Sequence, residues 1–157
     1  MINTGQFRHL FLSGTGSMGS CQRIDGVPKE AKCLMGYVVD WKNRIIAVTD
    51  ETGKMMARSI IRILWGYKIQ RPALLCERVY PDTATNDVRG AILNAAKKIA
   101  GEMKLDLFEN TKEGEGVKNE VLVSFASNAP FEYKDGVGVT NGTYKVKHFK
   151  LIQEAKR

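Results

Sequence analysis

The residues best suited to covalent or metal chemistry are three cysteines and two histidines. Cys21, Cys33, Cys76 and His148 supply three sulfurs and an imidazole, a donor set that can bind zinc tetrahedrally. They are scattered along the chain without a Cys-x-x-Cys pair, so we expect no metal site. Cys21 lies in the glycine-rich stretch GSMGSCQRIDG and could act as a nucleophile, with His148 or His9 as its base. The alternative interpretation is a small structural residue in a loop.

A second candidate site lies where an apolar run leads into a helical pattern. The segment ERVYPDTATNDVRGAILNAA joins a predicted strand, a loop and the first turns of a predicted helix. Free backbone N–H groups at a helix N-terminus attract anions. Arg78 and Arg89 stand on either side and could contact a phosphate, and Gly90 would permit close backbone approach. The alternative is an ordinary helix start with exposed arginines.

The chain as a whole is basic, with a net charge of +7. This charge favours an anionic partner such as a phosphate, a nucleic acid or an acidic protein surface. In TYKVKHFK, strand alternation places Lys145 and Lys147 on one face and Tyr144, Val146 and His148 on the other. A basic strand face can follow a nucleic-acid backbone, but lysines also protect sheet edges from aggregation. Both interpretations remain open.

The elements that would position these residues follow from the apolar pattern. Four compact apolar runs with short connections, at 33–41, 44–50, 55–65 and 71–81, predict a four-strand antiparallel meander. A helical period follows in TNDVRGAILNAAKKIAGEMK, where apolar residues from Val88 to Met103 recur at alternating steps of three and one. This pattern predicts one long central helix. Its candidate N-caps are Thr83, Thr85 and Asn86.

Two or three further strands are predicted after the helix. The runs LDLF and EVLVSFAS carry strand formers, the chain ends on a closing strand, and the glycine-rich loop ENTKEGEGVKN separates the first two. Strands, one long helix and more strands predict an α+β protein with a mostly antiparallel sheet. Residues 1–32 are expected to form a glycine-rich N-terminal segment with a long ordered loop. Within it, an apolar group would dock a short strand or helical turn: Phe7, Leu10, Phe11 and Leu12.

Length, cysteine count and hydropathy indicate the number of domains, the cellular location and whether the chain enters a membrane. A chain of 157 residues favours a single domain, here 1–157 with its α+β core at 33–157. An odd count of three cysteines favours reduced thiols and a cytoplasmic location. No apolar run approaches the roughly 20 residues that span a bilayer, and the first residues lack a secretory-signal pattern, so we expect no membrane partner.

The order of elements resembles the GNAT-type N-acetyltransferase superfamily, which has an antiparallel meander followed by a central helix whose start holds a pyrophosphate. KCLMGYVVD and NRIIAVTDETGKMMARSIIRI resemble the meander, and PALLCERVYP resembles the strand whose backbone contacts the acyl-pantetheine arm. VRGAILNAAKKIAGEMKLDLF is similar to the central helix, and VLVSFASNAPFEYKDGVG resembles a late strand. The chain departs from the phosphate-loop signature at Asp87 and Ile92.

The resemblance implies an acyltransferase or acyl-CoA-binding domain, active or catalytically degenerate, that uses acetyl-CoA and an amine substrate. It implies that Glu77 removes the amine proton and that Tyr133 protonates the leaving thiolate. The backbone from Cys76 to Val79 would hold the thioester carbonyl. The residues facing the pyrophosphate would be Asn86, Arg89, Gly90 and Arg78. Glu77 could equally be a surface carboxylate beside Arg78.

Two other functions are compatible with the sequence. The first is a non-enzymatic basic module that binds nucleic acid or an acidic protein, which the net charge favours. The second is a cysteine hydrolase that uses Cys21 as its nucleophile. The pattern of residues indicates no particular oligomeric state.

Overall fold

The computed structural model describes residues 2–4, 7–15, 19–111, 120–124, 129–134, 138–142 and 144–156. In these residues the helices are α1 (Phe7–Phe11), α2 (Pro28–Ala31), α3 (Cys33–Val39) and α4 (Asn86–Met103). The strands are β1 (Ile2–Thr4), β2 (Asn43–Thr49), β3 (Met55–Gly66), β4 (Arg71–Cys76), β5 (Asp106–Asn110), β6 (Leu122–Val123), β7 (Ala129–Lys134), β8 (Gly138–Gly142), β9 (Lys145–Val146) and β10 (Phe149–Gln153).

One mostly antiparallel sheet forms the centre of the molecule. Its strand order is β1-β2-β3-β4-β5-β10, with β6 paired to β3 and β9, while β7 and β8 form a separate hairpin. Among these pairs β4 and β5 run parallel, because the chain returns through α4 between them. The predicted α+β class with a mostly antiparallel sheet is therefore confirmed.

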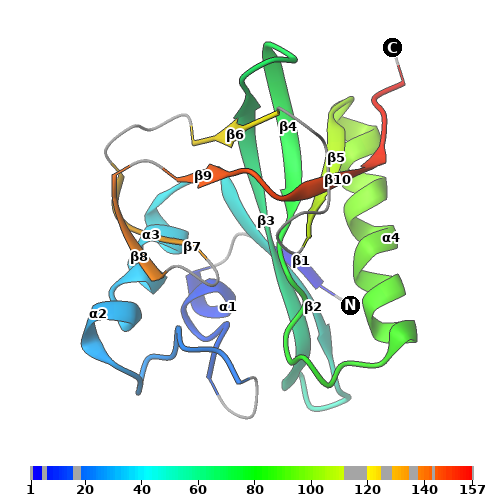
Figure 1. Ribbon diagram of the computed structural model, residues 1–157. Helices are drawn as coiled ribbons and strands as arrows, with labels where there is room; N and C mark the ends of the chain where they lie inside the picture. The colour runs from blue at the N-terminus through cyan, green and yellow to red at the C-terminus, as the bar shows by residue number, and fades with distance from the viewer. Residues whose placement is uncertain are drawn as a thin grey trace.

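Helices cover both faces of this sheet (Figure 1). On one face α4 packs over the strands through Ile92, Ala96 and Ala100, which join Ile61 and Leu74 in one apolar cluster. On the other face α1 and α3 pack on β2 and β3, and the β7–β8 hairpin lies beside α3. None of the described helices is long and apolar enough to cross a lipid bilayer.

The long helix forms as its apolar stripe predicts. The Thr85 hydroxyl accepts a hydrogen bond from the Val88 amide at 3.4 Å, so Thr85 is the N-cap among the three candidates. Alanines at the buried positions let the helix approach the sheet closely. The helix ends where Lys104 takes a left-handed conformation with φ of 54°.

The prediction of a strand at 33–41 is wrong, because residues 33–39 form helix α3. Cys33, Leu34 and Tyr37 are buried, whereas Met35 and Val39 are exposed, which is the spacing of a helix face. A continuous apolar run this short does not distinguish a strand from a buried helix. The fourth strand of the meander is instead β1, which pairs antiparallel with β2.

The N-terminal and C-terminal segments are only partly as predicted. The helical turn expected near Phe7 is α1, but the segment predicted as a long loop also contains α2, which Pro28 begins. The strand predicted at LDLF is confirmed as β5, and the closing strand is split into β9 and β10. Tyr144 and Val146 are buried while Lys145 and Lys147 are exposed, as the alternation predicts. Most of the ENTKEGEGVKN loop lies outside the described residues.

Candidate functional site

The carboxyl end of β4 contains a β-bulge. Cys76 pairs with Ile61 and Tyr80 pairs with Arg58, so four residue steps on the β4 side face three on β3. The extra residue lies within 77–79. A bulge re-aims the side chains of a strand and is common beside active sites.

Beyond the bulge the backbone keeps its bonds to β3 while its pairing with β5 ends. The Glu77 amide donates to the Ile60 carbonyl at 2.9 Å, and the Tyr80 amide donates to the Arg58 carbonyl at 2.8 Å. The parallel ladder with β5 has its last described pair at Cys76 and Glu109. The β4 and β5 segments therefore separate where the resemblance places the acyl-binding backbone, from Cys76 to Val79.

Glu77 is held inside the molecule by an arginine from β3. The Arg62 Nε lies 2.5 Å from the Glu77 Oε1, and the Tyr144 hydroxyl donates to the same oxygen at 2.7 Å. The exposed fractions are 1% for Arg62 and 5% for Glu77. The alternative of a surface carboxylate beside Arg78 is therefore wrong, since Glu77 pairs with a buried guanidinium.

The remaining nitrogens of Arg62 are also engaged. One donates to Asn43 Oδ1 and to Glu132 Oε1, both at 3.1 Å, and the other donates to the Tyr133 carbonyl at 3.1 Å. The guanidinium also lies 4.4 Å from the ring centre of Tyr144. A buried charge is tolerated when it is paired and hydrogen-bonded on all sides, and Arg62 meets that condition. We call Arg62 and its carboxylate, tyrosine and asparagine contacts the Arg62 cluster: Tyr37, Asn43, Glu77, Glu132, Tyr133 and Tyr144.

Burial sets the protonation of the groups around Arg62. Burial, together with the nearby charge of Glu77, raises the pKa of Tyr37 and Tyr144 above that of free tyrosine, so both hydroxyls remain protonated and can donate. Burial also raises the pKa of Glu132, against the opposing effect of Arg62 and Lys42. The cluster is therefore a set of neutral donors and carboxylates arranged around one fixed cation.

Tyr133 connects the Arg62 cluster to the surface. Its hydroxyl lies 2.9 Å from the Cys21 Sγ, and Cys21 is exposed while Tyr133 is 5% exposed. Since the Tyr133 carbonyl contacts Arg62, the two predicted catalytic residues, Glu77 and Tyr133, approach the same guanidinium. The structure thus brings together residues that are far apart in the sequence.

Sequence reasoning did not find Arg62 or its partners Asn43, Glu132 and Tyr144. One signal was present, because Arg62 interrupts the apolar run MMARSIIRILW and a charged residue in a buried strand needs a partner. The identity of that partner depends on the fold, since Glu132 is 70 residues away in the sequence.

The residues predicted to face a pyrophosphate surround the start of α4. Arg89 donates to the Asp82 carbonyl at 2.6 Å and to the Ala84 carbonyl at 3.0 Å, which folds its guanidinium onto the loop before the helix. Arg78 pairs with Asp82 and lies over the Tyr80 ring. Asn86 is exposed at the first helical position, and a Cβ placed on Gly90 would meet no atom within 4 Å. The helix start is open at Gly90, while both arginines contact the loop.

The cysteines occupy three separate environments. Cys33 lies in α3 with its Sγ 3.9 Å from the Lys29 carbonyl, and Cys76 lies in β4 with its Sγ 3.3 Å from the Ser59 hydroxyl. Burial raises the pKa of Cys33 to about 11 and that of Cys76 to about 12. Across the described ranges no three Cys, His, Asp or Glu side chains gather in a group that could hold a metal ion.

Comparison with known proteins gives structural similarities but no sequence match. No protein-family model matches the sequence, and no curated protein matches it significantly. Two solved structures share the fold over about three quarters of this chain. One is a ribosomal-protein-alanine N-acetyltransferase from Brucella melitensis biovar Abortus 2308, with a TM-score of 0.52, 15% identity, and coverage of 72% of this chain and 80% of that chain. The other is described as a probable acetyltransferase, with a TM-score of 0.56, 14% identity, and coverage of 74% and 81%. The chain therefore has a GNAT-like fold.

Proposed function

We propose that this chain transfers an acetyl group from acetyl-CoA to an amine substrate. The observation that carries the proposal is the bulged end of β4, where the strand separates from β5 beside the buried Glu77 carboxylate. Backbone N–H groups freed by such a separation can polarise a thioester carbonyl as negative charge develops on its oxygen. The GNAT-like fold agrees with this placement of the reaction.

Glu77 is the proposed general base. The hydrogen bonds that Arg62 and Tyr144 donate to Glu77 both go to Oε1, so Oε2 is the oxygen that would accept a proton from the amine, directly or through water. The amine nitrogen then bonds to the acyl carbon, the carbon–sulfur bond breaks, and the thiolate takes a proton from the proposed acid, Tyr133. The proton on Glu77 then passes through solvent to the Tyr133 phenolate, which restores both residues and balances the exchange.

The phosphates of the acyl donor are proposed to lie at the start of α4. The open space at Gly90 fits a close approach to the helix N-terminus, where the partial positive charge favours anions. Arg78 and Arg89 would add positive charge from the loop that they hold in place, and Asn86 is exposed beside them.

Ligand binding tests this proposal directly. Acetyl-CoA at a concentration of about 100 times its Kd should stabilise the folded state by about 2.7 kcal/mol and so raise Tm. ATP is the matched control, because it carries adenosine and phosphates without the pantetheine arm. No rise in Tm with acetyl-CoA or with CoA would contradict the proposal.

A substitution at Glu77 separates chemistry from binding. Glu77→Gln keeps an oxygen for Arg62 but cannot accept the amine proton, so it should bind acetyl-CoA normally and lose release of free thiol on a panel of amines. Glu102→Gln, on the exposed face of α4, is the control and should retain activity. Equal thiol release by Glu77→Gln and the unaltered chain would exclude Glu77 as the base.

A further inference from the structure

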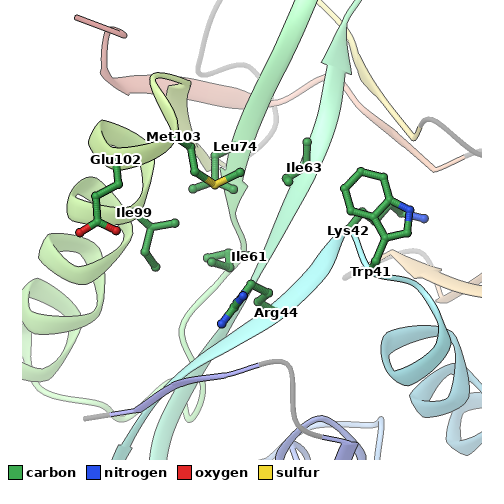
Figure 2. Close-up of a pocket in the computed structure, with 9 residues that line it drawn as sticks. All are labelled: Trp41, Lys42, Arg44, Ile61, Ile63, Leu74, Ile99, Glu102 and Met103. Atoms are coloured by element: carbon green, nitrogen blue, oxygen red, sulfur yellow. The ribbon is translucent and has the colours of Figure 1, made fainter.

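A concave surface lies on the opposite side of the sheet from Glu77. It is a groove of about 510 Å³ between the last turns of α4 and Trp41 (Figure 2). Ile61 and Ile63 line its floor and flank Arg62 along β3, so strand alternation directs them away from the Arg62 cluster. The groove is therefore separate from the proposed acetyl-transfer site.

The lining of the groove is largely apolar and only partly covered. Trp41 is 76% exposed and Met103 is 44% exposed, although Ile61 beneath them is fully covered. Ile63 and Ile99 are half-buried between these walls. Figure 2 shows Met103 extending over the floor from α4 while the Trp41 ring stands on the other side. An indole and a thioether facing an aliphatic floor form a surface suited to a flat or extended apolar group.

One charge is available at the rim of this groove. Arg44 is exposed there and forms no ion pair with any residue of the described segments. The other basic residue, Lys42, contributes its stem, because its ammonium pairs with Asp40 and lies 3.3 Å from Glu132. The carboxylate in the lining, Glu102, lies 4.0 Å from Lys98 and points away from Trp41. The unpaired charge beside the apolar floor is therefore positive.

We propose that this groove binds a small apolar molecule that carries one anionic group, with the apolar body between Trp41 and Met103 and the anion at Arg44. The volume of the groove lies within the range of small-molecule sites. The charge complementarity selects an acid over a neutral or cationic compound of the same shape. The site does not depend on the proposed acetyl transfer, because it is formed on the other face of the sheet.

The test compares two fluorescent probes that share their ring system. 1-Anilinonaphthalene-8-sulfonate carries an anion, and N-phenyl-1-naphthylamine lacks it. The sulfonate should bind more tightly than the neutral probe. Energy transfer from Trp41 to the bound sulfonate should be lost in Trp41→Phe. Arg44→Gln should weaken the sulfonate about three- to fivefold and leave the neutral probe unchanged. Met103→Glu should weaken both probes about tenfold or more.

Matched substitutions elsewhere separate this site from general surface binding. Met56 is 52% exposed on β3 outside the groove, and Lys54 is an exposed cation in the turn between β2 and β3. Met56→Glu and Lys54→Gln should leave both affinities unchanged. Sulfonate binding that is unaffected by Arg44→Gln and Met103→Glu would overturn the proposal, as would a Trp41-dependent dimer in sedimentation, which would make a second copy of the chain the occupant. Neither result requires acetyl-CoA, so the outcome is independent of the proposed function.

Discussion

At the scale of single residues, the Arg62 guanidinium is held by contacts on several sides. It is 1% exposed and satisfies two carboxylates, one amide and one backbone carbonyl. Removing a partner from such a network leaves the others buried and uncompensated.

The first prediction concerns this network. Arg62→Met should lower the free energy of unfolding by about 3–5 kcal/mol, because Glu77 and Glu132 lose their shared cation. Urea unfolding measures the change. Arg44→Met is the control, since Arg44 is exposed and surface changes usually stay within about 0.5 kcal/mol. Equal stability of the two variants would contradict the role assigned to Arg62.

The second prediction uses the pKa of Glu132, which burial raises above its usual 4.5. A raised pKa means that folding favours the protonated form, so this contribution to stability is present at low pH and is lost as pH rises above 4.5 through the folded-state value. Glu132→Gln has no such proton to lose. The stability of this variant relative to the unaltered chain should therefore be greater at pH 7 than at pH 4. Urea titrations at the two pH values measure the difference. A difference that is constant with pH, or of opposite sign, would contradict this.

The roles proposed for Glu77 and Tyr133 come from the family resemblance and from no other feature of the sequence. From the sequence alone, Glu77 could be a surface carboxylate and Tyr133 an ordinary strand tyrosine. No spacing rule links the two positions. Their common contact with Arg62 depends on strands that are distant in the sequence, with separations of 15 and 71 residues. Tertiary pairing of this kind has no local signal.

At the scale of elements, α4 shows what local pattern can predict. Its apolar stripe fixes which face meets the sheet, and the observed N-cap, Thr85, is one of the three candidates in the sequence. Helix α3 shows the limit, because the run CLMGYVV is apolar enough to fit a strand or a helix. Packing against α1 and β2 decides between them.

The third prediction concerns the start of α4. Thr85→Ala should cost about 1 kcal/mol, because the Val88 amide loses its side-chain acceptor. Thr83→Ala is the matched control, since Thr83 is exposed two residues earlier and the cap assigned to α4 is Thr85. Thermal unfolding of both variants measures the difference, and a Thr83 effect as large as that of Thr85 would place the cap elsewhere.

At the scale of the whole molecule, the three thiols lie in different layers. Cys21 is at the surface beside Tyr133, Cys33 lies in α3, and Cys76 faces the α4 side of the sheet. Cys33 and Cys76 are 1% and 2% exposed, so the reactivity of each thiol reports whether the layer that covers it opens.

The fourth prediction uses iodoacetamide at pH 8. The native protein should take one label, at Cys21, because Cys33 and Cys76 are buried with pKa values of about 11 and about 12 and present almost no thiolate. Denaturant should expose the other two. Mass spectrometry of the native and unfolded chains counts the labels. Rapid native labelling of Cys33 or Cys76 would show that the corresponding layer opens readily.

The partners of Arg62 are synthesised at different times, because some lie close to Arg62 in the sequence and others lie far after it. Asn43 and Glu77 emerge from the ribosome close to Arg62 in time, at separations of 19 and 15 residues, but Glu132 and Tyr133 follow 70 and 71 residues later. A nascent chain halted after β5 would already hold the central strands, yet its guanidinium would still lack the later partners. The buried guanidinium is therefore fully paired only after the C-terminal strands have been synthesised.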